Sequence, residues 1–464
     1  MGETGAHGEQ IHPLGSLRNL LSLTGIGLTT AAVAAFLILF LGDLLGLHTT
    51  NPYMGIVLFI VLPVFAVIGL LLIPVGAVFE RRRIRRGQPA SVWPRIDFNN
   101  PMQLRRAGLL AVLIVANIAI VTLGGYGGLE YMETPAFCGQ VCDQAMQPEF
   151  IAHQSAPHAS VPCVACHIGP GAGAKAESKL AGVKRVFAVA FGTYQQPIPL
   201  PAAELLPARD TCERCHWPEK FHGDQLRHIH EYADDEANTE SVTNLLMHLG
   251  GGNERLGFAE GIHWHMNLAN EIEFVATDDQ RQVIPYVRMT DGNGVVTEYV
   301  TPGVTEEELA NGERRVMDCM DCHNRPSHPI AATAARAVDV SLTRGETPKA
   351  LPFVKREAVK LLEKSYPSQE VAMEEIAAAL GDFYRREYTQ LWDSRGKDVE
   401  RAVEAVRAIY RRNVFPEMRV GFGTYPNNIG HTDFPGCFRC HDGEHVSSDG
   451  LTIVYDCETC HAFP

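Results

Sequence analysis

Five copies of the pattern Cys-x-x-Cys-His dominate this sequence and contain ten of its twelve cysteines. The cysteine pairs are Cys163/Cys166, Cys212/Cys215, Cys319/Cys322, Cys437/Cys440 and Cys457/Cys460, and the histidines that follow them are His167, His216, His323, His441 and His461. Disulfides and zinc ribbons do not require a histidine directly after the second cysteine. Covalent haem does, because the two thiols bond to the porphyrin vinyl groups and the histidine ligates the iron. The pattern therefore predicts at least five haems of type c.

Three apolar segments precede the first cysteine, at about residues 20–41, 53–79 and 107–123. Each is close to the roughly 20 residues that a helix needs to cross a bilayer. Buried helices of a soluble domain and a cleaved signal peptide are the alternatives, but three long runs in succession fit neither well. We expect residues 1–129 to form a membrane anchor of three transmembrane helices.

Basic residues between the second and third apolar segments indicate the direction of this anchor. Only Glu80 and Asp97 oppose them. The eight arginines are Arg81, Arg82, Arg83, Arg85, Arg86, Arg95, Arg105 and Arg106. Because cytoplasmic loops are rich in arginine and lysine, this loop is expected in the cytoplasm and the chain after the third segment outside it. The sequence predicts a multi-pass protein of the bacterial inner membrane with its haem domain in the periplasm.

The charge of the chain follows the same division. From Ala107 onward, 31 lysines and arginines face 49 aspartates and glutamates, a formal charge of −18. Such an excess serves solubility in many proteins, and it can also steer a basic partner to the surface. We favour the first explanation, and we expect no nucleic-acid partner.

The predicted fold is mostly α-helical, with little regular structure around the haems and a small β-hairpin insertion. We expect a tetrahaem domain over 130–345, interrupted at about 220–310, then a helical segment over 346–415 and a dihaem segment over 416–464. Alternating residues predict strands at 271–275, 283–289 and 295–300, with a turn at Asp291-Gly292-Asn293-Gly294. Amphipathic periodicity predicts helices at 374–388 and 398–412.

The remaining cysteines, Cys138 and Cys142, are spaced by three residues and are followed by Asp143 instead of a histidine. A disulfide or two free thiols would account for them without any cofactor. Their position between the third apolar segment and a row of haem motifs favours another haem. Met146 lies four residues beyond Cys142.

This region resembles the NapC/NirT/NrfH family of membrane-anchored cytochrome quinol dehydrogenases over about residues 130–330. The resemblance is carried by Phe137-Cys138-Gly139-Gln140-Val141-Cys142, Met146-Gln147-Pro148-Glu149, Ser155-Ala156-Pro157-His158 and Cys163-Val164-Ala165-Cys166-His167-Ile168-Gly169. It implies a sixth haem on Cys138 and Cys142 with Met146 as its iron ligand. The chain departs from the family in its three predicted spans, its insertion and its additional C-terminal residues.

The resemblance also implies distal iron ligands. It assigns His158 to the haem at Cys319/Cys322, His328 to the haem at Cys212/Cys215, and Lys179 to the haem at Cys163/Cys166. In the C-terminal segment His431 and His445 are the spare histidines nearby, and we expect them to ligate the last two haems. Of the histidines between 222 and 265, at most one is expected to be a ligand.

The family resemblance predicts oxidation of membrane quinol, with menaquinol as the expected donor and a periplasmic cytochrome or reductase as the acceptor. Quinol oxidation releases protons, so it requires a base near the first haem. Glu130, Glu133 and Asp143 are the candidates, although an ordinary acidic surface would look the same. Two alternatives are an electron-relay subunit of a larger respiratory complex without its own quinone site, and a reductase acting at a five-coordinate haem.

Overall fold

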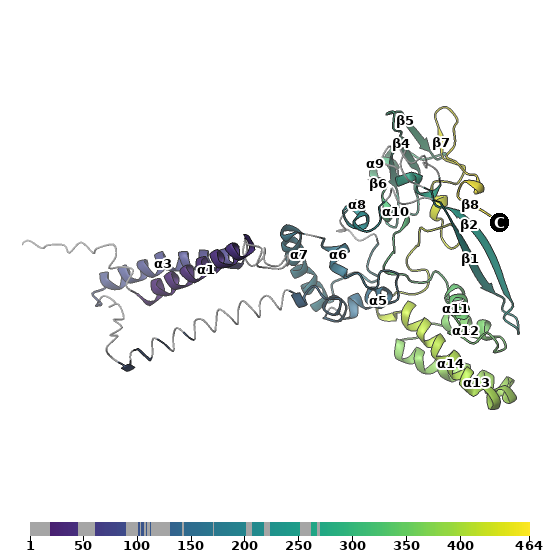
Figure 1. The fold of residues 1–464 in the computed structure, drawn as a ribbon, viewed down its shortest axis with the longest axis horizontal. Helices are drawn as coiled ribbons and strands as arrows, with labels where there is room; N and C mark the ends of the chain where they lie inside the picture. Colours follow the sequence, from purple (N-terminus) through teal and green to yellow (C-terminus); the bar gives the residue numbers. More distant parts are fainter. Residues whose placement is uncertain are drawn as a thin grey trace, which may run out of the picture. The chain divides into compact units, whose positions relative to one another are not determined.

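The computed structural model describes residues 19–44, 61–89, 101–102, 104–105, 108, 112, 130–141, 143–169, 171–200, 207–217, 223–250, 261–266 and 270–464. These residues form two compact units (Figure 1). The first unit holds the described residues up to Glu133 together with 171–181, and the second holds 134–169 and 182–464. About half of the described chain is helical, and two β-sheets account for most of the remaining regular structure.

The first unit contains a pair of packed helices, α1 (Leu20–Leu44) and α3 (Leu62–Arg85). Small residues let their backbones approach closely. A Cβ atom added at Gly69 would lie 2.4 Å from Thr29 Oγ1, and one at Gly25 would lie 2.6 Å from the Gly69 carbonyl oxygen. The Ser22 hydroxyl donates a hydrogen bond to the Ile73 carbonyl at 2.9 Å. Glycine contacts and serine hydrogen bonds of this kind are typical of helix pairs in lipid.

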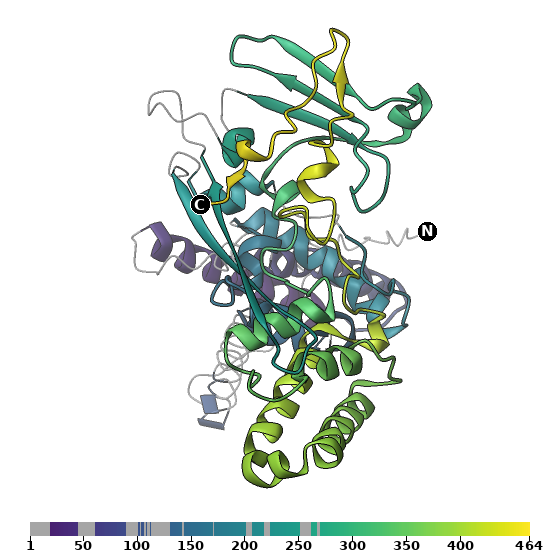
Figure 2. The same cartoon turned by 90° about the vertical axis from the view of Figure 1, so that its right-hand side faces the viewer.

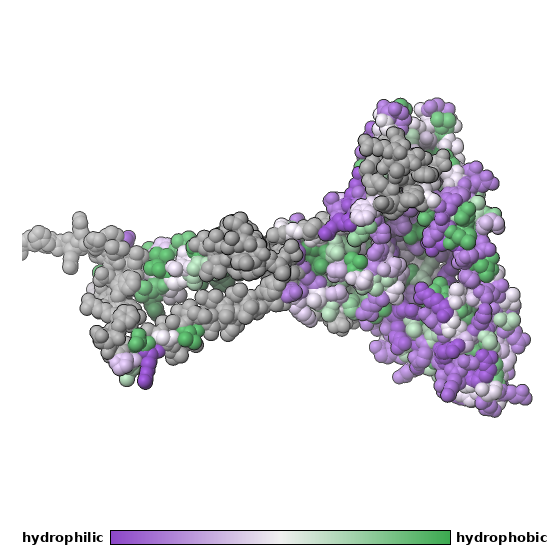
Figure 3. All heavy atoms as spheres, viewed as in Figure 1, coloured by the Kyte–Doolittle hydropathy of each residue, from purple (hydrophilic) through white to green (hydrophobic). Residues whose placement is uncertain are grey.

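Helix α3 carries the membrane-spanning signal of the described chain. Among the described residues, Val64–Arg85 is the one segment long and apolar enough to cross a bilayer, and Leu20–Phe36 is a shorter apolar helix. Side chains such as Leu70, Leu71 and Phe79 are more than half exposed, and Figure 3 shows apolar residues on the surface of this helix pair. The third predicted span lies outside the described residues, apart from isolated positions at its start.

The second unit contains helical elements that carry the predicted haem-attachment cysteines or lie between them along the chain. They are η3 (Phe137–Val141), α5 (Asp143–Gln154), α6 (Cys163–His167), α7 (Ala172–Ala190, which starts in the first unit), α8 (Ala208–Thr211), η4 (Cys212–Arg214), α10 (Cys319–Cys322), η9 (Gly436–Arg439) and η10 (Cys457–Thr459). Residues three apart face the same side of a helical turn. A single turn therefore suffices to present both thiols of each motif in one direction.

Two antiparallel sheets follow in the insertion. The first has the strand order β1-β2-β8, with β1 (Asp224–Tyr232), β2 (Glu240–His248) and β8 (His461–Ala462). The second has the order β6-β3-β4-β5-β7, with β3 (Glu271–Ala276), β4 (Tyr286–Thr290), β5 (Val296–Val300), β6 (Glu313–Val316) and β7 (Val446–Ser447). The short elements η7 (Ile262–Met266) and α9 (Glu306–Asn311) flank β3 to β5.

The predicted strands in the insertion are confirmed as β3, β4 and β5. The β-structure is more extensive than the small hairpin we expected, because β1 and β2 pair over nine residues each and three short strands extend the sheets. The long hairpin is polar on both faces, and the first five residues of each strand are exposed. It therefore lacks the apolar alternation by which strands are recognised in sequences.

Three of the four helices that form the largest described apolar core of the second unit lie within residues 346–415, the predicted helical segment, and α11 (Ala334–Thr343) precedes that range. The three are α12 (Val354–Leu362), α13 (Gln369–Glu387) and α14 (Thr389–Asn413), followed by the turn η8 (Pro416–Met418). Buried residues of all four helices meet in one cluster, which includes Val338, Ile376 and Ile409. No haem motif lies within this segment.

The β1–β2 hairpin joins this helical segment to the C-terminal haem motif (Figure 2). Near its tip, Tyr232 packs into the helical core, and the Asn238 amide donates hydrogen bonds to the carbonyls of Lys349 and Leu351. At the other end, Met247 of β2 is the register partner of His461. The hairpin thus positions the last haem motif relative to the helices.

Candidate haem-attachment sites

The five Cys-x-x-Cys-His motifs share one local geometry. In three of them the backbone N–H of the histidine donates to the carbonyl of the first cysteine, so the histidine directly continues the turn. These bonds are His216 to Cys212 at 2.8 Å, His323 to Cys319 at 2.8 Å and His441 to Cys437 at 3.0 Å. None of the ten motif cysteines forms a disulfide. Two thiols and one imidazole on a single turn are the donor set that covalent haem requires.

Cysteines of different motifs lie next to one another. The Cys138 thiol hydrogen-bonds to Cys163 and lowers the pKa of Cys163 to about 6, against the opposing effect of burial. In the same way Cys319 lowers the pKa of Cys212 to about 6. The contact between Cys138 and Cys163 places the first predicted attachment site beside the second. The contact between Cys212 and Cys319 places the third beside the fourth.

The other motifs are close enough to influence one another electrostatically. Burial raises the pKa of Cys166, and the neighbouring Cys212 raises it further. Burial likewise raises the pKa of Cys460, with Cys437 adding to the effect. Burial raises the pKa of Cys322 as well, and Cys437 again adds to the rise. Together with the thiol contacts, these proximities place Cys138 and the five motif pairs in a series that follows their order in the sequence.

Cys215 is the second cysteine of the third predicted attachment site. It is exposed, as Cys166 and Cys457 are, and its thiol takes part in neither of the two thiol contacts described above. Its backbone N–H donates to the Cys212 carbonyl at 3.1 Å, which keeps Cys215 on the motif turn. Its charge also adds to the rise in the pKa of Cys166. Haem attachment at Cys215 therefore rests on its spacing from Cys212 and stays a prediction.

Each motif histidine has a histidine from outside the motifs beside it. The ring centroids are 6.1 Å apart for His167 and His328, 5.9 Å for His216 and His158, 6.3 Å for His323 and His263, 5.7 Å for His441 and His265, and 6.3 Å for His461 and His431. A bond from an imidazole nitrogen to a first-row transition metal is about 2.0–2.1 Å long, so two rings on opposite sides of one metal ion have centroids about 6 Å apart. All five spacings match this requirement, and the residues present therefore fit haem.

Backbone carbonyls orient four of these histidines through Nδ1. His158 donates to Pro326 at 3.2 Å, His265 to Ile262 at 2.7 Å, His328 to Glu149 at 2.9 Å and His441 to Val454 at 2.6 Å. With the proton held on Nδ1, the lone pair of Nε2 is available to a metal. Burial also lowers the pKa of His167, His263, His265, His323 and His328, which favours the neutral imidazole that ligation requires.

Arg325 fixes the position of His328. Its guanidinium lies 3.0 Å from the Glu149 carboxylate and 4.2 Å from the centre of the Tyr425 ring. Its Nε donates to the His328 carbonyl at 2.6 Å. A second histidine, His153, lies 6.0 Å from His328, but its Nε2 hydrogen-bonds to the Val161 carbonyl at 3.0 Å.

These positions differ from the distribution that the family resemblance implied. The structure places His158 beside His216, whereas we had assigned it to the haem at Cys319/Cys322. It places His328 beside His167, whereas we had assigned it to the haem at Cys212 and Cys215. Lys179 lies on α7, and its side chain, like all of Cys142, lies outside the described part of the chain.

The two C-terminal assignments have different outcomes. His431 lies beside His461 and also stacks on Phe438, with ring centroids 4.1 Å apart. His445 is 1% exposed, and both of its ring nitrogens are hydrogen-bonded, Nδ1 to Asp442 at 2.9 Å and Nε2 to the Ile284 carbonyl at 2.7 Å. Both ring nitrogens are therefore directed at acceptor groups of the protein, and we do not retain His445 as a ligand.

Sequence reasoning missed His263 and His265 as a pair, because it allowed at most one ligand in the insertion. The available signal was the segment Gly261-Ile262-His263-Trp264-His265, in which two histidines flank a tryptophan. Their partners, His323 and His441, lie 60 and 176 positions further along the chain. Spacing alone could not have identified these pairs.

The predicted proton acceptors occupy different environments. Glu133 is buried and forms an ion pair with Lys175 at 3.0 Å, while its Oε1 has no hydrogen-bond partner among the described residues. Glu130 is exposed, and only the backbone of Asp143, the first residue of α5, is described. Met146 is half-buried on the same helix, which packs against the π-helical turn η3 that carries Cys138. A Cβ atom at Gly139 would lie 2.2 Å from the Phe150 ring, so glycine permits this close packing.

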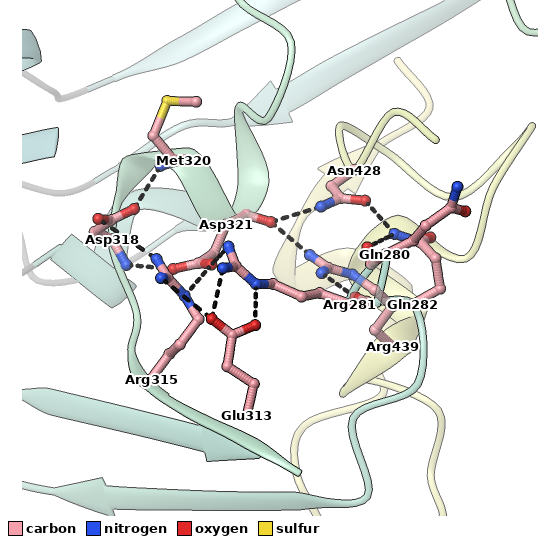
Figure 4. A network of polar contacts seen from close by, with 10 residues as sticks. All are labelled: Gln280, Arg281, Gln282, Glu313, Arg315, Asp318, Met320, Asp321, Asn428 and Arg439. Carbon is pink, nitrogen blue, oxygen red and sulfur yellow. Dashed lines mark hydrogen bonds and ion pairs between the residues drawn. The ribbon is translucent and has the colours of Figure 1, made fainter. Parts of the chain in front are cut away.

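A polar network connects the attachment turns at Cys319/Cys322 and Cys437/Cys440 (Figure 4). Arg439, between the cysteines of one motif, donates to the carbonyl of Asp321, between the cysteines of the other, at 2.6 Å. The same carbonyl accepts from Asn428 at 2.9 Å. The buried Asp321 carboxylate accepts from the Asp318 amide at 2.8 Å and from Arg315 at 3.2 Å. The network holds two consecutive attachment turns together.

The motif turns, the adjacent cysteines and the paired histidines define a c-type cytochrome with several haem-attachment sites. Comparison with known proteins agrees: the chain is 40% identical over 452 residues to the cytochrome c-type protein ImcH of Geobacter sulfurreducens, covering 96% of this chain and 88% of ImcH. The chain therefore belongs to the ImcH family of c-type cytochromes, whose cofactor is covalently bound haem and whose role is electron transfer. No protein-family model and no solved structure matches the chain.

Proposed function

We propose that this chain is a membrane-anchored cytochrome with six covalent haems, which oxidises membrane quinol and delivers the electrons to a periplasmic cytochrome or reductase. The observation that carries the proposal is the unbroken series of neighbouring cysteine pairs from Cys138 to Cys460. Haem c, when bound, supplies reversible one-electron chemistry. A series of adjacent attachment sites is what conduction over the length of a domain requires.

The residues proposed to hold the haems are the six cysteine pairs, the five motif histidines and a second set of ligands. Met146 is proposed for the first haem, where Asp143 replaces the motif histidine. His328 replaces Lys179 as the proposed distal ligand of the second haem, because it lies beside His167. His158 lies beside His216 and is assigned to the third haem. His431 lies beside His461 and is assigned to the sixth haem.

The resemblance to the NapC/NirT/NrfH family supports quinol, with menaquinol as the expected donor. Glu130, Glu133 and Asp143 are proposed as the proton acceptors, since they lie beside Cys138 in sequence. Glu133 is a good candidate on physical grounds, because one of its buried carboxylate oxygens pairs with Lys175 while the other accepts no hydrogen bond in the described chain.

The proposed location is the bacterial inner membrane, with three transmembrane helices and the haem domain in the periplasm. The apolar surface of α3 and the small-residue contacts between α1 and α3 support the anchor. The arginines at the C-terminal end of α3 support a cytoplasmic loop after the second span.

The test is stopped-flow reduction of the full-length protein in lipid nanodiscs by a menaquinol analogue, followed through the haem absorbance. We expect rapid reduction that a quinone-site inhibitor blocks, with dithionite defining complete reduction. Full reduction by dithionite with none by the quinol would overturn the quinol site and favour a relay subunit of a larger membrane complex. A high-spin ferric signal from a haem other than the first, for which Met146 is the one proposed ligand, would instead favour a reductase with an open iron position.

A further inference from the structure

The turn η7 lies between β2 and β3 in the insertion, where the family resemblance assigns no ligand. It begins after Gly261, whose φ is +82° and at which a Cβ atom would lie 2.6 Å from the His248 carbonyl oxygen. The His263 amide donates to the Leu249 carbonyl at 2.8 Å. Only glycine combines this backbone conformation with such a close approach. The turn is thus held against the end of β2 by its own backbone.

The three aromatic residues of the turn face different surroundings. Trp264 packs on the apolar core of the five-stranded sheet. His263 lies beside His323, with ring planes 6° apart, and His265 lies beside His441, with ring planes 85° apart. Two histidines separated by a single residue therefore approach the motif histidines of two different attachment sites.

One further contact connects the turn to the first of these sites, and a hydrogen bond within the turn orients one of its histidines. Met266 Sδ lies 4.0 Å from Cys319 Sγ, at the first of the two motifs. The Nδ1 of His265 donates to the Ile262 carbonyl within the turn itself, which directs its other nitrogen away from the turn backbone. The attachment turns are themselves linked by the hydrogen bond from Arg439 to the Asp321 carbonyl.

We propose that this turn supplies the distal iron ligands of two consecutive haems, His263 for the haem at Cys319/Cys322 and His265 for the haem at Cys437/Cys440. The inference rests on haem attachment at both motifs as proposed above. It gives the insertion a function, since one short element clamps the last haem of the tetrahaem region and the first haem of the C-terminal pair. The junction between the two haem groups then depends on the insertion.

The competing explanation is structural, because histidines often serve as hydrogen-bonding groups in turns. The two explanations predict different spin states. Loss of a distal ligand leaves the iron five-coordinate and high-spin, whereas loss of a structural histidine leaves the ligand set intact. Covalent attachment depends on the cysteines, so the number of haems per chain stays the same in either case.

The test uses the full-length variants His263→Gly and His265→Gly, with His248→Gly as the matched control at the end of β2, where the His248 ring pairs with Asp224. Electron paramagnetic resonance of the oxidised proteins should show one more high-spin haem per chain than the wild type in each turn variant, two more in the double variant and no increase in the control. Added imidazole should return each to the low-spin state. A spectrum unchanged from the wild type in either turn variant, or an additional high-spin signal that imidazole does not remove, would overturn the assignment.

Intact mass measured on the same samples separates this inference from the proposed six-haem function. Wild-type protein with fewer than six haems would count against that function, whatever the spin states of the variants. Six haems in the wild type, with no new high-spin signal in the turn variants, would count against His263 and His265 as ligands. That result would leave the proposed six-haem function intact.

Discussion

At the scale of single residues, each proposed haem site with a motif histidine combines local and distant side chains. The cysteines and the motif histidine lie within five residues of one another, so a sequence displays them directly. The facing histidines come from far along the chain, as with His167 and His328, and only folding brings them together. This is why the attachment residues could be predicted from sequence, whereas the partners of His158 and His328 could not.

Met146 is the residue on which the first haem depends in this account. Replacing it with leucine keeps a similar apolar volume but removes the thioether sulfur. We expect the Met146→Leu variant to be reduced more slowly by quinol, while dithionite still reduces the other haems completely. Stopped-flow absorbance measures both rates, and Met373→Leu in the helical segment is the control. Unchanged quinol kinetics would remove Met146 from the pathway.

Glu313 provides a pH-dependent contribution to stability. Both of its oxygens accept hydrogen bonds from Arg281 at 2.7 Å, and this lowers the pKa of the carboxyl group below its ordinary value of 4.5. The stabilisation is therefore present above that value and is lost as the pH falls through the lower folded-state pKa. Because the Glu313 side chain is nearly half exposed, Glu313→Gln should cost at most about 1 kcal/mol at neutral pH.

Urea unfolding of the wild type and of Glu313→Gln at several pH values tests whether the stabilisation by Glu313 is lost on acidification. The difference in unfolding free energy should shrink towards acid pH. A difference that grows on acidification would contradict it. Glu298→Gln is a suitable control for the loss of a strand carboxylate, since Glu298 accepts a hydrogen bond from a tyrosine, Tyr286, and not from an arginine.

At the scale of elements, regular patterns were the predictable part of the fold. The helices α13 and α14 and the strands β3 to β5 follow the amphipathic and alternating patterns that predicted them. The β1–β2 hairpin has no such pattern, because contacts at its tip and at its other end hold it, as with Asn238 and Leu351. Its existence depends on distant partners, which a local pattern does not reveal.

The α1–α3 pair offers a test of membrane-helix packing. Valine at Gly69 would drive a side chain into Thr29, whereas a Cβ atom at Gly27 meets nothing within 4 Å. Overpacking of this kind costs about 1–3 kcal/mol, which corresponds to roughly 5- to 150-fold in an equilibrium constant. Hydrogen exchange of α1 and α3 in nanodiscs should accelerate by that factor in Gly69→Val. Equal acceleration in Gly27→Val would contradict the packing.

The helical core should control the stability of the second unit without affecting haem ligation. Ile376 is completely buried in the centre of this core. Truncation to alanine should cost about 2–5 kcal/mol, and the exposed Glu374→Ala variant should change little. Thermal unfolding followed by circular dichroism measures the loss, while the haem absorbance spectrum should match the wild type. A new high-spin haem in Ile376→Ala would show that the core also positions a ligand.

At the scale of the whole molecule, the cysteine pairs are arranged one beside the next in the order of the sequence. The network between Asp321 and Arg439 holds the fourth and fifth attachment turns together, and the turn at His263 and His265 faces the same two sites. The helical segment contributes stability through its own apolar core. The proposed function therefore combines a row of haem sites with a scaffold that fixes their spacing.

The number of covalent haems is the most direct test of this account, because the series begins at the pair without a motif histidine. Intact mass spectrometry of the purified full-length protein should show six haem additions, and the Cys138→Ala/Cys142→Ala variant should show five. Five in the wild type would leave Cys138 and Cys142 unmodified. The row of haems would then lose its first member, and the proposed route from membrane quinol would be contradicted.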